Sequence, residues 1–204
     1  MSRISELREQ LVSLAKHGSV VALLGWDQEV DLPPKGQAFR GEVTALLAGE
    51  LHQRVIDPQF VKLVKQLAQP PAMKRLSRAE QIIVRETWRD LQRSMKLPAA
   101  FVEELTRLTA RAYSVWVEAR QNSDSSRFAP VLTKIVELVR RQADLLGYQD
   151  SPYDALLDLY EPDMSVAQLD GLFEPLALEL ASLIKQAKLA KPYQLPPGDY
   201  PLDK

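Results

Sequence analysis

Hydrophobic residues recur every three or four positions along most of the chain, which is the spacing of one face of an α-helix. Near the N-terminus this stripe comprises Ile4, Leu7, Leu11, Leu14 and Ala15. The apolar run 19–24 that follows fits either the end of this first helix or a brief extended piece, and we favour helix. Because no alternation of period two extends far and no βαβ unit is visible, the pattern predicts an all-α fold.

Prolines, glycines and capping sequences set the expected helix boundaries. Pro33-Pro34 ends the first helical region, because proline lacks the donor and clashes with the preceding turn. Asp57-Pro58 is typical of an N-cap followed by a first-turn proline, while residues 77–80 and 165–168 have the pattern of capping boxes. The further helices are expected over about 36–51, 58–67, 77–91, 98–122, 127–146, 152–160 and 165–184.

Three boundary details remain to be tested by the structure. Pro70-Pro71 is expected to end the helix predicted over 58–67, and Gly147 is expected to end the helix predicted over 127–146. Pro175 lies inside the last helix and either kinks it or marks a break. Residues 191–204 hold four prolines and a glycine, so we expect a helical domain over 1–190 and a linker or extended arm over 191–204.

Composition narrows the class of protein. A chain of 204 residues with a net charge of −1 can bury a sizeable core and lacks the basic balance of a nucleic-acid binder. Without cysteine it forms neither disulfides nor thiolate metal sites. No signal peptide and no run of 18 apolar residues is present, so we expect a cytoplasmic protein that binds neither nucleic acid nor membrane.

Residue patterns that carry chemistry are sparse. A metal-binding helix of the HExxH type needs two histidines one turn apart, but His17 and His52 each stand alone, and both fit positions near helix ends. Asp154 and Asp158 lie one turn apart and face either a groove or, more commonly, water. The tryptophans at 26, 88 and 116 are expected to anchor the core rather than to stack on a ligand. The residues therefore indicate no catalytic and no metal-binding position.

One segment, GWDQEVDLPPKGQAFR at 25–40, groups Trp, Asp, Gln and Glu in a way that a core helix does not favour. It resembles the opening signature of the carboxypeptidase Taq family of metallocarboxypeptidases. Residues 97–148, from LPAAF to LGY, and residues 151–173, from SPYDALLDLYEP to LDGLF, resemble two further segments of the same family. The resemblance covers nearly the whole chain, and PYDALLDLYEP and WDQE with the trailing PP are its most specific strings.

This resemblance implies an all-helical fold like the N-terminal part of neurolysin-like and angiotensin-converting-enzyme-like peptidases. Full-length members are cytoplasmic, commonly homodimeric, and use zinc or another divalent metal to remove C-terminal residues from peptides. Their metal helix lies beyond the region matched here, so no catalytic or metal residue is carried over. The resemblance places Trp26, Asp27, Gln28 and Glu29 at a wall of the substrate groove. Within it we expect Trp26 to pack, Asp27 to cap a helix or turn, and the other two to face the groove or water.

Two departures from the family pattern concern tight turns. Asp163 replaces a glycine after YEP, so that corner is expected to differ, and Ser123-Asp124 stands where the family tends to have Asn-Asp.

The resemblance and the missing metal helix lead to two functional hypotheses. The chain is the N-terminal region of a metallocarboxypeptidase, inactive alone, which meets its peptide substrate only in the full-length context. Alternatively it is a standalone helical interaction or scaffold protein, whose bare apolar faces are covered by self-association or by a complementing C-terminal region.

Overall fold

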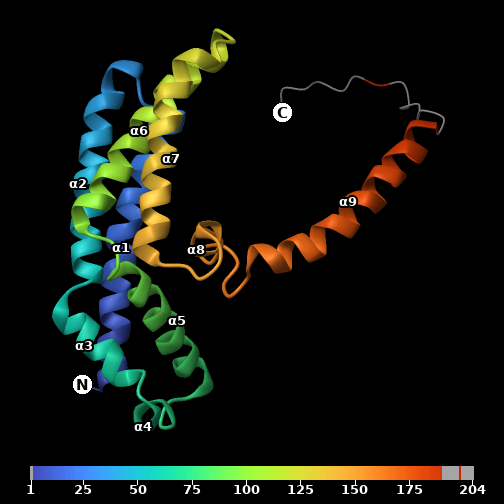
Figure 1. The fold of residues 1–204 in the computed structure, drawn as a ribbon. Helices are drawn as coiled ribbons and strands as arrows, with labels where there is room; N and C mark the ends of the chain where they lie inside the picture. Colours follow the sequence, from blue (N-terminus) through green and yellow to red (C-terminus); the bar gives the residue numbers. More distant parts are fainter. Residues whose placement is uncertain (1, 190–197, 199–204) are drawn as a thin grey trace. The chain divides into compact units, whose positions relative to one another are not determined.

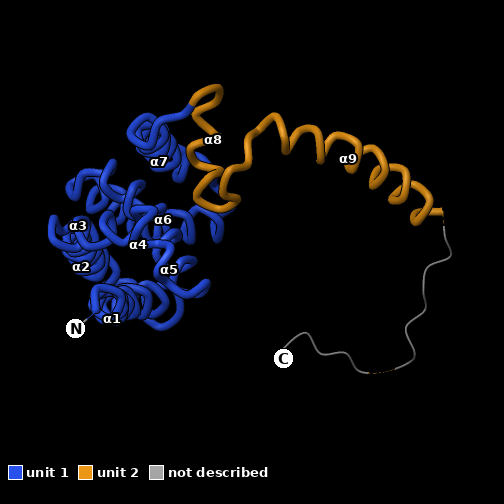
Figure 2. Tube along the Cα trace, turned by 90° about the horizontal axis from the view of Figure 1, so that it is seen from below, with its two compact units in different colours: residues 1–148 blue, residues 149–204 orange. Residues whose placement is uncertain are grey.

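The computed structural model describes residues 2–189 and residue 198, and all regular structure in them is helical (Figure 1). The all-α prediction is therefore confirmed. Contacts divide the chain into two units, residues 1–148 and 149–204, each of which is described here by itself (Figure 2). The sequence pattern did not place this boundary. Apart from residue 198, the predicted arm at 191–204 lies outside the described residues.

The first unit contains most of the helices. They are α1 (Arg3–Val30), the 3₁₀ turn η1 (Pro34–Gly36), α2 (Gln37–Val55), α3 (Pro58–Leu67), α4 (Pro70–Met73), α5 (Arg78–Ser94), α6 (Ala99–Gln121) and α7 (Ser125–Leu146). Helix α2 packs against both α1 and α6, and α7 packs on α6, so that the long helices form a bundle (Figure 1). Helices α3, α4 and α5 gather beyond one end of α2 and α6 (Figure 1).

Local sequence signals explain where these helices begin and end. The run 19–24 belongs to α1, which continues unbroken to Val30. The Asp57 carboxylate accepts hydrogen bonds from the backbone N–H groups of Gln59 and Phe60, and Ser77 and Glu80 form the expected capping box of α5. Pro70 and Pro71 do not end α3, which stops at Leu67. They open α4 instead, because a first-turn proline gives up no helical hydrogen bond.

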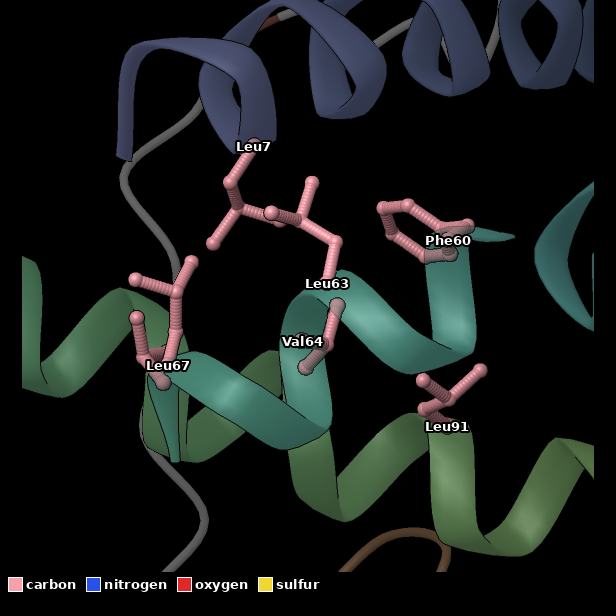
Figure 3. Packing of buried hydrophobic residues seen from close by; sticks show 7 residues of the cluster. Leu7, Phe60, Leu63, Val64, Leu67 and Leu91 are labelled. Atoms are coloured by element: carbon pink, nitrogen blue, oxygen red, sulfur yellow. The ribbon is translucent and has the colours of Figure 1, made fainter. Parts of the chain in front are cut away.

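The hydrophobic core of the first unit joins α1, α3 and α5. Its buried members are Leu7, Phe60, Leu63, Val64, Leu67, Val84 and Leu91, and six of them are labelled in Figure 3. Burial of each such side chain contributes about 1.5–3 kcal/mol of transfer free energy. This cluster therefore fixes the N-terminal half of α1 and leaves the C-terminal half, with the WDQE string, to be positioned by α2 and α6.

Small residues bring α2 and α6 close together. Gly41, Ala45 and Gly49 are buried and recur every four positions on one face of α2. A Cβ atom at Gly41 would lie 3.3 Å from the Ala110 Cβ, and one at Gly49 would lie 2.6 Å from the Glu103 Cγ. The two helices approach so closely because these positions carry almost no side chain.

The second unit holds α8 (Pro152–Leu157) and α9 (Val166–Leu189), and its acidic residues organise the turn between them. The Asp154 carboxylate accepts hydrogen bonds from the N–H groups of Ser151, at 3.2 Å, and Val166, at 2.8 Å. The Asp158 carboxylate accepts one from the Asp163 N–H at 2.9 Å. Both carboxylates therefore act as hydrogen-bond acceptors for backbone N–H groups.

Three further expectations for this part of the chain have clear outcomes. Ser165 and Gln168 form the predicted reciprocal contacts at the start of α9. Helix α9 runs through Pro175 without a break. Asp163 has a φ of 66°, so the corner keeps a left-handed turn although glycine is absent.

Candidate functional site

The WDQE string forms the last turns of α1, which ends at Val30. Successive residues of an α-helix are rotated by about 100°, so four in a row point to different sides. The helix thus separates Trp26, Asp27, Gln28 and Glu29 into side chains that hold α1 in place and side chains that face outward.

Asp27 ties α1 to α2. Its carboxylate forms an ion pair with the Arg40 guanidinium, and the two side chains are 33% and 21% exposed. Arg40 also donates a hydrogen bond to the Leu24 carbonyl at 3.3 Å. The predicted capping role of the Asp27 side chain is therefore wrong. The helix continues beyond this residue, and the carboxylate serves a contact between helices.

Gln28 ties α1 to α6. The residue is 5% exposed, and its side-chain amide nitrogen donates a hydrogen bond to the Ala110 carbonyl at 3.2 Å. Nearby, the Tyr113 hydroxyl donates to the backbone carbonyl of Glu29 at 3.1 Å. Ala110 and Tyr113 could not be found from the sequence alone, because nothing local links them to a string more than 80 positions earlier.

A small cleft of about 190 Å³ lies where α1, α2 and α6 meet. It is lined by Gly25, Gln28, Glu29, Thr44, Thr106, Thr109, Ala110 and Tyr113. The three threonines direct their hydroxyls to backbone carbonyls of their own helices, as Thr44 does to Arg40 at 2.9 Å. Each of these hydroxyls therefore donates its hydrogen bond within its own helix.

Trp26 and Glu29 are the outward members of the string. Trp26 is 56% exposed, so the prediction that it packs into the core is wrong. Trp116 is 40% exposed beneath the Arg120 guanidinium, and of the three tryptophans only Trp88 packs against the core cluster. The exposed indole at the end of α1 and the carboxylate of Glu29 are the groups of this string available to a ligand.

The two histidines serve as hydrogen-bond donors. His17 Nδ1 donates to the Ser13 carbonyl at 2.9 Å in the middle of α1, and His52 Nε2 donates to the Leu97 carbonyl at 2.7 Å. A carbonyl oxygen only accepts, so the nitrogen facing it carries the hydrogen. The expected position of His17 at a helix end is wrong, because α1 continues to Val30. His52 lies in the last turn of α2, near the helix end as predicted, and is 9% exposed.

The part of the chain that the structure describes contains no set of side chains that matches a divalent metal ion. No three side chains of His, Cys, Asp or Glu among residues 2–189 are grouped so that they could hold an ion. The carboxyl groups with shifted pKa values belong to helix ends instead. The Ser77 backbone N–H lowers the pKa of Glu80, and the Ser126 hydroxyl lowers the pKa of Asp124.

Comparison with solved structures defines the class of fold. The structure superposes on the crystal structure of BsuCP with a TM-score of 0.86 and 30% identity, covering 92% of this chain and 37% of that chain. Residues 6–203 match the family described as Carboxypeptidase Taq (M32) metallopeptidase. The chain therefore belongs to this family.

Two curated relatives show how much of the family's length is represented. Thermostable carboxypeptidase 1 of Pyrococcus furiosus is 34% identical over 187 residues, and carboxypeptidase 1 of Bacillus subtilis is 31% identical over 181 residues. These alignments cover 92% and 89% of this chain. The chain spans about 36% of the length of each relative.

Of the helices within residues 2–189, none is both long enough and apolar enough to cross a bilayer.

Proposed function

We propose that this chain is the N-terminal helical region of a metal-dependent carboxypeptidase, an enzyme that removes C-terminal residues from peptides, and that it has no peptidase activity alone. The observation that carries the proposal is the family match over residues 6–203 in a sequence whose only histidines are His17 and His52. Both imidazoles donate to backbone carbonyls on different segments. The metal and the groups around it would then come from the part of the relatives that this chain does not span.

A direct assay tests the missing activity. The purified chain is incubated with zinc or cobalt and an N-blocked dipeptide, and released amino acid is measured. We expect no release, with B. subtilis carboxypeptidase 1 as the positive control. Metal-dependent release that persists after mass spectrometry has excluded any contaminating peptidase would overturn the proposal.

Within that enzyme, we propose that Trp26 and Glu29 form part of the substrate-groove wall. Their exposure at the end of α1 supports this role, while the contacts of Asp27 and Gln28 to α2 and α6 hold the helix end in position. The groove belongs to the complete fold, so the peptide is a substrate only of the longer protein.

A chimera provides the test of this wall. The chain is joined to the portion of B. subtilis carboxypeptidase 1 that follows the matched region, and peptide hydrolysis is measured. Trp26→Ala and Glu29→Gln should raise KM several-fold at nearly constant kcat, because they remove contacts made equally in the ground and transition states. Leu23→Ala, an exposed position on the same helix, is the matched control. Equal effects at positions 23, 26 and 29 would rule out a specific wall.

The alternative, a standalone interaction or scaffold protein, is favoured by one observation. The outer face of α1 carries exposed apolar side chains at Val12, Val20, Leu23, Trp26 and Val30. A scaffold that uses this face would self-associate. Size-exclusion chromatography with light scattering distinguishes the scaffold from the carboxypeptidase region, because a strictly monomeric chain would argue against a scaffold that self-associates. Homo-oligomerisation and a cytoplasmic location remain predictions of the family resemblance.

A further inference from the structure

Helix α9 displays a row of apolar side chains to solvent. Every residue from 171 to 189 is exposed. The row comprises Leu172, Phe173, Leu176, Leu180, Leu183 and Ile184, and we call these six residues the α9 stripe. Their spacing of three and four places all six within about a third of the helix circumference.

The other side of α9 is different in character. At about 100° per residue, Asp170, Glu174, Lys185 and Lys188 fall on the side away from the α9 stripe. Leu178, which is 75% exposed, lies opposite the middle of the stripe. Leu189, which is 88% exposed, lies near Leu178 on this opposite side. The helix therefore has one broad face that is wholly apolar, as in helices that dock into grooves, and an opposite side that mixes charged residues with these two leucines.

Helix α9 also has little means of remaining helical alone. Pro175 lies in its interior, where a proline removes a backbone hydrogen bond and costs about 3 kcal/mol. Gly171 lowers the helix propensity further. Most helical stability in proteins comes from packing of the apolar face, and in α9 that face is exposed. A stable α9 thus requires a surface that covers the stripe.

The length of the relatives indicates what covers it. The family match extends to residue 203 and so includes α9, which makes the helix a part of the family sequence rather than an added arm. The chain covers 37% of BsuCP, so nearly two thirds of that chain lies outside the match. We propose that the α9 stripe docks into an apolar groove formed by this remaining portion of the carboxypeptidase Taq fold, and that α9 becomes stably helical on docking. This inference rests on the proposed function and names the partner surface.

Thiol labelling tests the docked face directly, since the chain contains no cysteine. Leu176→Cys places a thiol in the stripe, and Leu178→Cys places one on the opposite side. Each is made in the isolated chain and in the chimera with B. subtilis carboxypeptidase 1. Labelling of the peptide that carries the new thiol is followed by mass spectrometry. We expect both thiols to react rapidly in the isolated chain. In the chimera, the thiol at 176 should react at least tenfold more slowly, while the one at 178 stays reactive.

Amide hydrogen exchange supplies the second readout. Exchange over 166–189 should be at least tenfold slower in the chimera than in the isolated chain. Leu176→Asp combined with Leu183→Asp should remove this protection, whereas Leu178→Asp should leave it in place.

Several outcomes would overturn the proposal. Equal reactivity at 176 in the isolated chain and in the folded chimera would do so. Protection at 176 in the isolated chain that increases with protein concentration would show that a second copy covers the stripe. A protected stripe in a chimera without peptidase activity would leave the docking intact and refute the proposed function. Activity with an unprotected stripe would do the reverse.

Discussion

At the scale of single residues, two non-glycine positions among residues 2–189 have a left-handed backbone. Ser123 has a φ of 53° and Asp163 a φ of 66°. Both are positions where the sequence departs from the family pattern that it resembles, in which asparagine and glycine adopt such turns more readily. The turns persist because the flanking helices determine them. Strain is therefore expected at these two residues.

Substitutions at Ser123 should reveal that strain. Ser123→Asn should raise the free energy of unfolding by a few tenths of a kcal/mol, since asparagine is enriched in this region of φ/ψ space. Ser123→Val should lower it by about 1–2 kcal/mol, because a β-branched residue suffers most there. Urea denaturation checks the order Asn, Ser, Val, and valine ranking above serine would contradict the strain.

The half-buried ion pair of the WDQE string should be coupled to stability. Asp27→Asn leaves the Arg40 guanidinium, 21% exposed, without its carboxylate, and should lower the free energy of unfolding by about 1–2 kcal/mol. Combining it with Arg40→Met should cost less than the sum of the single changes. Glu42→Gln breaks the more exposed pair with Arg107 and is the control, with no measurable change expected. A double-mutant cycle that is additive at Asp27 and Arg40 would contradict this coupling.

At the scale of elements, the capping box of α5 makes stability depend on pH. The Ser77 backbone N–H lowers the pKa of Glu80 below its ordinary value of 4.5. A carboxyl with a lowered folded pKa stabilises the fold above its unfolded pKa. That contribution is lost as the pH falls from about 4.5 through the folded value. Glu80→Gln keeps both capping contacts but does not titrate, so its stability should fall less between pH 5 and pH 3. Parallel curves for the two proteins would count against this linkage.

The contact between α2 and α6 should tolerate little added volume. Ala45 is fully buried between Gly41 and Gly49 on the face of α2 that carries the close approach. Ala45→Leu should lower the free energy of unfolding by about 1–3 kcal/mol, because the extra carbons must displace α6. Ala15→Leu, at an exposed position of α1, is the matched control and should change stability little. Similar melting temperatures for the two variants would refute tight packing.

The sequence predicted most of these elements because their signals are local. Asp57, Ser77 and Ser165 bond to amides two or three positions away, so a short window contains both partners. The candidate site was only partly predictable. Gln28 bonds to Ala110 across 82 positions, and the exposure of Trp26 depends on which helices cover α1. A hydrophobic period shows that a residue is apolar without showing which surface covers it.

At the scale of the whole molecule, the division at residue 148 separates different kinds of packing. All seven members of the core cluster lie within residues 7–91, and the contact between α6 and α7 completes the first unit. Among the described residues of the second unit, 149–189 and 198, only Ala155 and Leu157 are buried, and hydrogen bonds accepted by Asp154 and Asp158 shape the turn before α9. Cooperative stability is therefore expected to reside in the first unit.

Removal of the second unit tests this expectation. A chain ending at Tyr148 should unfold in a single transition, with a melting temperature within a few degrees of that of the full chain, because it retains every member of the core cluster. Circular dichroism gives the transition, and hydrogen exchange should show the same protection in α3 and α5 of both proteins. Leu63→Ala in the shortened chain provides the contrast. Loss of that buried side chain should cost about 2–5 kcal/mol. A shortened chain with helical content but no cooperative melting would mean that the first unit depends on residues 149–204 for its packing.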